Sequence, residues 1–253
     1  MRKIYSLTVA FLFAAVLFVL FFPVLAVFPT YRWRTTVSRV YARWWAKCVL
    51  WAIRVRLVVN GAEHLRTLPA VLTFNHVNTL DFFINAAFAP PHCLVFGKRE
   101  LVKVPFVGWM WAVGGHPMIR RKDRSQWAGL MDGIAARLAT GRHSTFISPE
   151  GTRSRDGKLL PFKKGPFHLA IQSGAAIVPC VLRGCGDCYQ PDGTPVPGTV
   201  TVDVLAPIAT DQWRAETIDE HVAEVRQLYL EALGEAERAR EPEPAPEVVS
   251  ASA

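Results

Sequence analysis

The first 31 residues limit the possible architectures of this chain most strongly, because they include an apolar segment long enough to cross a bilayer. The run from Ile4 to Tyr31 contains no charged side chain, and its apolar part extends to Phe28. A transmembrane helix needs about 20 apolar residues to cross about 30 Å of hydrocarbon. We therefore expect residues 1–31 to form a membrane anchor, which is a transmembrane helix or, if Pro23 breaks it, a re-entrant helix.

A cleaved signal peptide is the alternative, since Arg2 and Lys3 precede the apolar run. The run is long for the hydrophobic region of such a peptide, and Val24-Leu25-Ala26 is a poor small-residue cleavage site. An uncleaved anchor is therefore favoured. Basic residues are more numerous after the run than before it, which predicts that the bulk of the protein lies on the cytoplasmic face of the cell (inner) membrane.

The segment that follows the anchor combines tryptophans with basic residues. The first 60 residues contain nine lysines and arginines and no acid. Indole rings and cations suit the boundary between water and anionic lipid, so we expect residues 32–53 to form an interfacial amphipathic helix that contacts membrane lipids. A core helix with a solvated basic face is the alternative. No nucleic-acid partner is expected, because no helix-turn-helix, zinc-finger or RNA-binding signature follows.

The remainder of the chain predicts one α/β domain over residues 54–237. Short β-rich runs alternate with helical patterns, and 253 residues of which 51% are hydrophobic suffice for one such core. The expected strands are 54–59, 70–74, 94–96, 144–147, 175–182 and 200–205. The expected helices are 80–88, 125–139, 162–172 and 216–233. We therefore expect a mixed sheet flanked by helices, followed by a disordered tail over residues 238–253.

One segment that joins an expected strand to an expected helix contains the residues of a general base, Asn75-His76-Val-Asn-Thr-Leu-Asp81. Five residues advance an ideal helix by about 500°, so His76 and Asp81 can meet only if His76 lies in the turn before the helix. The carboxylate would then fix the imidazole tautomer, and the free ring nitrogen could remove a proton from a substrate hydroxyl. The spacing alone also suits a capping aspartate and a structural histidine.

A second polar segment, Pro149-Glu150-Gly151-Thr152-Arg153-Ser154, follows the expected strand 144–147 and suits an anionic ligand. Arg153 offers a planar fork of donors that matches phosphate oxygens. Further cations follow at Lys158, Lys163 and Lys164. A solvated basic loop is the alternative for this stretch.

These segments resemble the motifs of the glycerolipid acyltransferase family. Four blocks occur in the family's order: Asn75-His76-x4-Asp81, Gly115-His-Pro-Met-Ile119-Arg120-Arg121, Pro149-Glu150-Gly151-Thr152-Arg153-Ser154 and Ile177-Val178-Pro179. The resemblance implies direct transfer of an acyl group to the free hydroxyl of a lysophospholipid. The acceptor it favours most is 1-acyl-sn-glycerol-3-phosphate, whose acylation gives phosphatidic acid. The implied donor is acyl-CoA or acyl carrier protein, and no metal or cofactor is expected.

The resemblance also assigns roles to residues. His76 would be the base and Asp81 its orienting partner. The glycerol phosphate of the acceptor would be bound by a set of residues from the second and third blocks, which are Arg121, Glu150, Gly151, Thr152 and Arg153. Arg120 and Ser148 depart from the family pattern, which commonly has an acid and an aromatic residue there. Another lysophospholipid or a lyso-aminolipid therefore remains an alternative acceptor.

Two other classes of function are alternatives to acyl transfer. A membrane lipase is disfavoured because no Gly-x-Ser-x-Gly nucleophile motif occurs. A catalytically silent binder of phosphate lipids would keep the fold without the chemistry. Cys185-Gly-Asp-Cys188 has the spacing of a metal or redox motif, but no second Cys or His pair accompanies it, so we expect reduced thiols in a loop.

Overall fold

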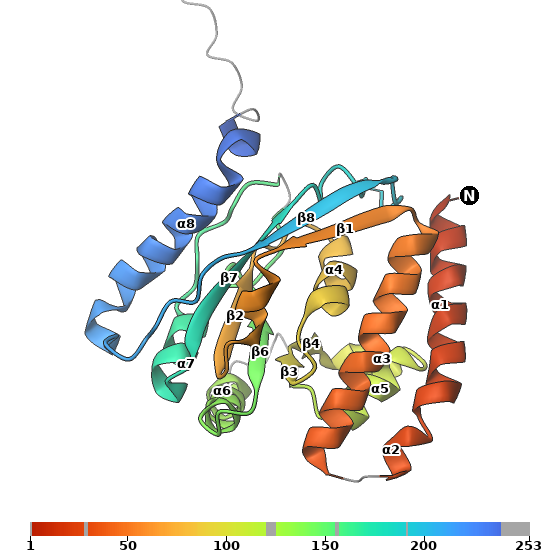
Figure 1. Cartoon of the computed structure of the whole chain (residues 1–253), viewed down its shortest axis with the longest axis horizontal. Coiled ribbons are helices and arrows are strands. Elements are labelled where there is room, and N and C mark those ends of the chain that lie inside the picture. Colours follow the sequence, from red (N-terminus) through yellow and green to blue (C-terminus); the bar gives the residue numbers. More distant parts are fainter. Residues whose placement is uncertain (1, 28–29, 120–124, 155–156, 191, 239–253) are drawn as a thin grey trace, which may run out of the picture.

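The computed structural model describes residues 2–27, 30–119, 125–154, 157–190 and 192–238 (Figure 1). Its centre is a six-stranded sheet in the order β1-β8-β7-β2-β6-β3. The strands are β1 (Val55–Asn60), β2 (Ala70–Phe74), β3 (Cys93–Val95), β6 (Ser144–Ile147), β7 (Ala176–Arg183) and β8 (Gly198–Val204). All neighbours pair in parallel except β7 and β8, which are antiparallel. The predicted mixed α/β sheet is confirmed.

Helices cover both faces of the sheet (Figure 1). One face packs against α3 (Tyr31–Ala52) and α4 (Leu80–Phe88), and the other against α6 (Ser125–Leu138), α7 (Gly165–Ser173) and α8 (Ile218–Arg238). Successive residues of β2 point to opposite faces, as strand geometry requires. Leu72 therefore lies in the first hydrophobic cluster and Val71 in the second.

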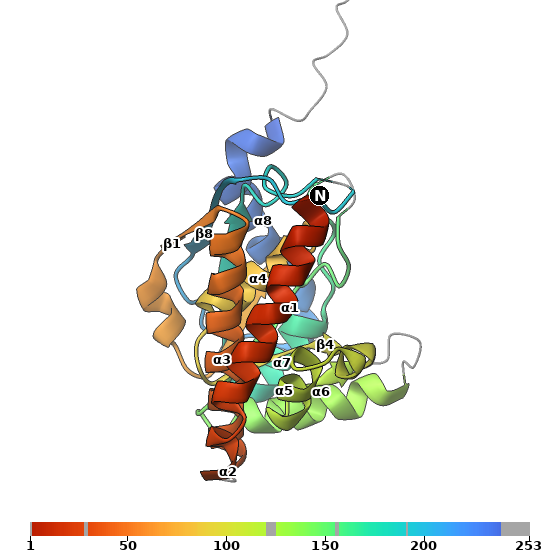
Figure 2. The ribbon, with the colours of Figure 1, turned by 90° about the vertical axis from the view of Figure 1, so that its right-hand side faces the viewer.

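The N-terminal helices form an antiparallel hairpin beside this domain (Figures 1 and 2). The first helix, α1 (Arg2–Phe21), ends before Pro23, and the short α2 (Val24–Val27) leads to α3. The helix is therefore interrupted at Pro23. The hydroxyl of Tyr41 donates to the Ala14 carbonyl at 3.0 Å, and the indole N–H of Trp45 donates to the Ala10 carbonyl at 2.7 Å. These bonds attach α3 to the middle of α1.

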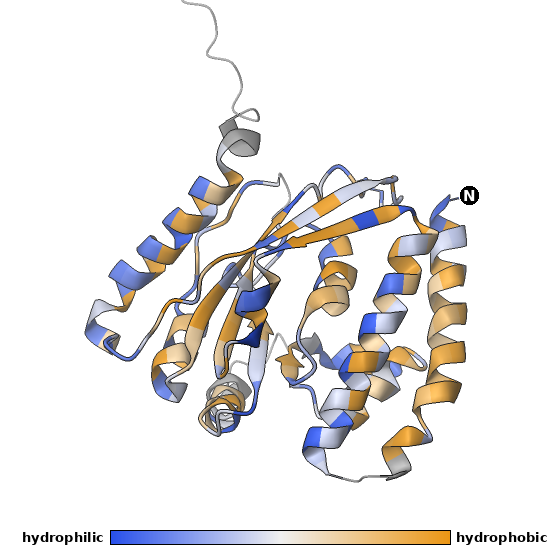
Figure 3. Cartoon of the chain, viewed as in Figure 1, coloured by the Kyte–Doolittle hydropathy of each residue, from blue (hydrophilic) through white to orange (hydrophobic). Residues whose placement is uncertain are grey.

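Among the described helices, α1 is long and apolar enough to cross a membrane, judged by length and composition. Most of its residues are hydrophobic (Figure 3), and those that are exposed include Ile4, Leu7, Phe11 and Leu12. By contrast, α3 buries one face against α1 and α4, including Val37, Tyr41 and Trp45, and leaves Trp44 and Trp51 exposed. Thus α3 has both the packed face of a core helix and exposed tryptophans that suit a membrane surface.

Most predicted elements occur within two residues of their expected bounds. Helix α7 starts three residues later than expected, because the preceding Lys163 donates its N–H to the Pro149 carbonyl at 2.7 Å and Pro166 occupies the first turn. The helix α5 (Val107–Val113), the pair β4 (Gly97–Lys98) and β5 (Met118–Ile119), and the 3-10 turns η1 (Ala62–Arg66), η2 (Arg99–Lys103) and η3 (Ala215–Thr217) were not predicted. Helix α8 continues to Arg238, and the rest of the expected tail lies outside the described residues.

Candidate active site

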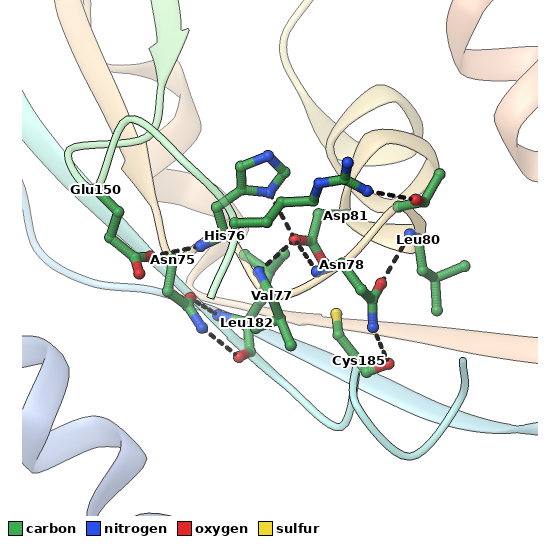
Figure 4. A network of polar contacts seen from close by, with 11 residues as sticks. Asn75, His76, Val77, Asn78, Leu80, Asp81, Glu150, Leu182 and Cys185 are labelled. Atoms are coloured by element: carbon green, nitrogen blue, oxygen red, sulfur yellow. Dashed lines mark hydrogen bonds and ion pairs between the residues drawn. The ribbon is translucent and has the colours of Figure 1, made fainter. Parts of the chain in front are cut away.

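His76 and Asp81 meet at the carboxyl end of β2. His76 lies in the turn between β2 and α4, and Asp81 lies in the first turn of α4. The imidazole Nδ1 is 2.9 Å from the Asp81 Oδ2 (Figure 4). This is the strand-to-helix geometry that the five-residue spacing requires, because two residues on one regular helix at that spacing would point apart.

The Asp81 carboxylate is held in one orientation. Its side chain is only 1% exposed, and the same Oδ2 also accepts the N–H groups of Val77 at 2.6 Å and Asn78 at 2.9 Å. Since a carboxylate accepts, the His76 Nδ1 must carry the proton, which leaves Nε2 with a free lone pair. The His76 side chain is 24% exposed and lines a cavity. The pair can therefore remove a proton from a group bound in that cavity.

Two asparagines, whose individual roles the sequence did not predict, connect this turn to the end of β7. Asn75 donates to the Leu182 carbonyl at 2.9 Å and accepts the Leu182 N–H at 2.7 Å. Asn78 donates to the Cys185 carbonyl at 2.8 Å and accepts the Leu80 N–H at 2.8 Å. Side-chain amides can replace ladder bonds where two strands separate, and these amides fix the turn in this way.

The segment Pro149–Ser154 is attached directly to the backbone of His76. Glu150 is 2% exposed, and its Oε1 accepts the His76 N–H at 2.6 Å while its Oε2 accepts the Leu160 N–H at 3.0 Å. The Ser154 N–H donates to the His76 carbonyl at 2.9 Å. Burial raises the pKa of Glu150 above its ordinary value, although the two backbone donors act in the opposite direction. Because both Glu150 oxygens accept hydrogen bonds from backbone N–H groups, this side chain stabilises the turn that contains His76.

Three further residues predicted to bind phosphate, Gly151, Thr152 and Arg153, lie around the same turn. Gly151 has a φ of +67°, and a side chain there would approach the Lys163 Nζ within 2.8 Å. Arg153 is exposed and donates to the Thr79 hydroxyl at 2.9 Å, which places its guanidinium at the start of α4. Thr152 lines the cavity together with Gly151 and Lys163. Arg121 and Arg120 lie outside the described residues.

A cavity of about 980 Å³ extends from His76 between the sheet and the helices. Its walls are mainly apolar and include Trp45, Phe74, Phe82, Met110 and Phe146. No aspartate or glutamate is among the described residues that line it, whereas Arg39, Lys98 and Lys163 are. A long apolar ligand with a negatively charged group matches these walls.

The cysteines of the Cys185-Gly-Asp-Cys188 segment are buried free thiols of the first hydrophobic cluster. Burial raises the pKa of both thiols, and the nearby Asp81 carboxylate raises that of Cys185 further. The Cys185 sulfur points toward Asp81 (Figure 4). Within the described ranges, no group of three or more His, Cys, Asp or Glu residues is placed to hold a metal ion.

A His–Asp pair beside a basic turn and an apolar cavity is an arrangement that suits an enzyme acting on an amphiphilic, anionic molecule. Comparison with known proteins agrees with this class. The family model described as Acyltransferase matches residues 56–183. The chain belongs to this acyltransferase family.

Relatives named 1-acyl-sn-glycerol-3-phosphate acyltransferase match most of the chain. The relative from Limnanthes douglasii is 35% identical over 207 residues, which cover 79% of this chain and 71% of the relative. The relative from Saccharomyces cerevisiae is 31% identical, with 79% and 69% covered. The crystal structure of a 1-acyl-sn-glycerophosphate acyltransferase from Thermotoga maritima has a TM-score of 0.73 at 24% identity, over 96% of this chain and 100% of that chain. This likeness shows a shared fold.

Proposed function

We propose that the chain acylates 1-acyl-sn-glycerol-3-phosphate to give phosphatidic acid, with acyl-CoA or an acyl carrier protein as the donor. The observation that carries the proposal is the 2.9 Å contact between the His76 Nδ1 and the Asp81 Oδ2, made beside the turn that contains Arg153. The names of the relatives support this acceptor. Another lysophospholipid or a lyso-aminolipid is the alternative acceptor, and a membrane lipase the alternative enzyme.

In the proposed reaction, the His76 Nε2 removes the proton from the free glycerol hydroxyl as that oxygen attacks the thioester carbonyl carbon. The new C–O bond forms and the C–S bond breaks, and the leaving thiolate takes the proton from the imidazolium. Asp81 stabilises the transient positive charge on the ring. The thioester is already activated, so this chemistry needs neither a metal nor a cofactor, and no covalent acyl-enzyme forms.

The acceptor phosphate would lie at the basic turn. Arg153 supplies a fork of donors, Lys163 supplies a second cation, and Gly151 allows the backbone to approach the ligand closely. Thr79 keeps the Arg153 guanidinium near the start of α4, and therefore near His76. Arg121 would add a further cation to this site.

A panel of lysolipids and acyl thioesters incubated with the purified protein tests this proposal. We expect the ester product, identified by mass spectrometry, to form fastest from lysophosphatidic acid, because its phosphate is the most exposed anion in the panel. Preference for phosphate-free acceptors would contradict the role of Arg153. Release of free fatty acid from phospholipid, with labelling by a fluorophosphonate probe, would favour the lipase.

We also propose that the protein lies on the cytoplasmic face of the inner membrane, with the apolar flank of α1 in the lipid. This flank contains Ile4, Leu7, Leu12 and Val19, all exposed. Because α1 packs along the strongly basic α3, the hairpin suits insertion into one leaflet, where α3 can meet anionic headgroups. The membrane supplies the acceptor and receives the product.

The substitution Leu12→Glu is expected to lower binding to phosphatidylglycerol vesicles at least about tenfold, since a charge in the lipid-facing surface is costly. Co-sedimentation measures the bound fraction. Ala223→Glu, which adds the same charge to an exposed position of α8, is the control and should bind like the wild type. Equal binding of both variants and the wild type would show that α1 does not face lipid.

A further inference from the structure

The two oxygens of the Asp81 carboxylate have different surroundings. The Oδ2 accepts the His76 Nδ1–H and the N–H groups of Val77 and Asn78. The Oδ1 is buried and takes no hydrogen bond from an N–H or O–H group of the described residues. An unpaired oxygen on a buried carboxylate is costly, because the charge has lost its water. Since this oxygen is closed off from solvent, a donor packed against it inside the protein must supply the bond.

The Cys185 thiol is such a donor. Cys185 is 1% exposed, and its sulfur is directed at the Asp81 carboxylate (Figure 4). Burial raises the pKa of this thiol most, and the charge of Asp81 and a hydrogen bond with Asp81 raise it further. A thiol with a raised pKa stays protonated at neutral pH, so Cys185 has a hydrogen to donate.

The turn that holds the dyad also fixes the backbone of Cys185. Asn78 gives its backbone N–H to the Asp81 Oδ2 at 2.9 Å and its side-chain N–H to the Cys185 carbonyl at 2.8 Å. On the other side, Gly184 has a φ of +81°, and a Cβ there would lie 2.6 Å from the Thr199 carbonyl oxygen. Cys185 is therefore held between the end of β7 and the start of α4, with its side chain toward Asp81 (Figure 4).

We propose that Cys185 is a positioning residue of the dyad, whose S–H donates to the Asp81 Oδ1. This bond satisfies the second oxygen, so the buried carboxylate stays charged and does not rotate to exchange its two oxygens. The Oδ2 then remains on the His76 Nδ1–H and keeps the lone pair of Nε2 available to the cavity. The inference rests on the proposed acyl transfer, in which His76 is the base.

The substitutions Cys185→Ala and Cys185→Ser separate this role from simple packing, because the new side chains are similar in size and only the hydroxyl is a donor. We expect Cys185→Ala to lower kcat for acyl transfer roughly 10-fold, with little change in the KM for lysophosphatidic acid, since the carboxylate loses a hydrogen bond. Cys185→Ser should keep kcat within about threefold of the wild type. Cys188→Ala, which removes the other buried thiol of the segment, is the control and should keep both parameters.

The S–H stretching band gives a second measurement that does not depend on turnover. Infrared difference spectra between the wild type and either Cys185 variant isolate the Cys185 band. The Cys188 band, isolated in the same way with Cys188→Ala, is the reference, because the Cys188 sulfur lies beside Gly198. We expect the Cys185 band at the lower frequency, since donation to a carboxylate weakens the S–H bond.

The possible outcomes separate this inference from the proposed function. A kcat of Cys185→Ser no higher than that of Cys185→Ala would overturn the inference and leave acyl transfer standing. A Cys185 band at the frequency of a thiol without a hydrogen bond would overturn it as well. If the wild type transfers no acyl group to lysophosphatidic acid, the proposed function fails, while the S–H band still tests the contact with Asp81.

Discussion

Replacing His76 by alanine is expected to lower kcat for acyl transfer by about 10³-fold, since a positioned general base contributes roughly 10²- to 10⁴-fold. The His76 imidazole is held by Asp81 in one tautomer and also lines the cavity. Binding of lysophosphatidic acid should change little, because Arg153 and Lys163 remain. Initial rates and a lipid-binding titration on the same preparation measure the two effects separately.

His64 offers a matched control for this substitution. It also has an acidic neighbour, Glu63 at 3.9 Å, but it lies on the surface turn η1. His64→Ala should therefore retain full activity. Unchanged turnover in His76→Ala would exclude the proposed base, and a loss of lipid binding equal to the loss of turnover would indicate that the substitution had damaged the site as a whole.

Arg153→Ala is expected to raise the KM for lysophosphatidic acid roughly 10- to 100-fold, with a smaller change in kcat. The guanidinium is exposed and its described contact is with the Thr79 hydroxyl, so the melting temperature should remain near that of the wild type. Arg153→Lys should recover only part of the affinity, because an ammonium group lacks the planar fork. Steady-state kinetics over a range of acceptor concentrations give both parameters.

Lys164 provides the comparison for Arg153. It is basic and belongs to the same stretch, but its Nζ contacts Asp219 at 2.7 Å on α8. Lys164→Ala should thus leave the KM nearly unchanged. If both substitutions raised the KM equally, the effect would come from general positive charge rather than from a phosphate site at Arg153.

The sequence predicted the elements around the dyad most accurately. β2, α4 and β6 have the expected bounds, because each is a short apolar run ended by polar or turn-forming residues. The contact between His76 and Asp81 was expected because a strand-to-helix turn lies between β2 and α4. Helix α5 escaped prediction because its seven residues are too few to show a helical period, and its first residues follow Pro105.

Two features of the site depend on contacts that no local pattern encodes. Glu150 was expected among the phosphate-binding residues, yet its partners are the N–H groups of His76 and Leu160, 74 and 10 residues away. Arg39 belonged to a basic segment expected to meet lipid headgroups, and the structure buries it beside α4. Backbone partners and burial both result from tertiary packing, which a single sequence does not display.

Because of the strand order, the active site can form only after much of the chain has been synthesised. β2 lies between β6 and β7, so the groups that fix His76 and Asn75 come from residues 74 and 107 positions further along the chain. A ribosome delivers the N-terminal hairpin first, and domains fold as their residues emerge. If the protein has the proposed membrane location, a nascent chain would reach the bilayer while His76 still lacks these contacts, and the enzyme would become active only where its lipid substrate is already present.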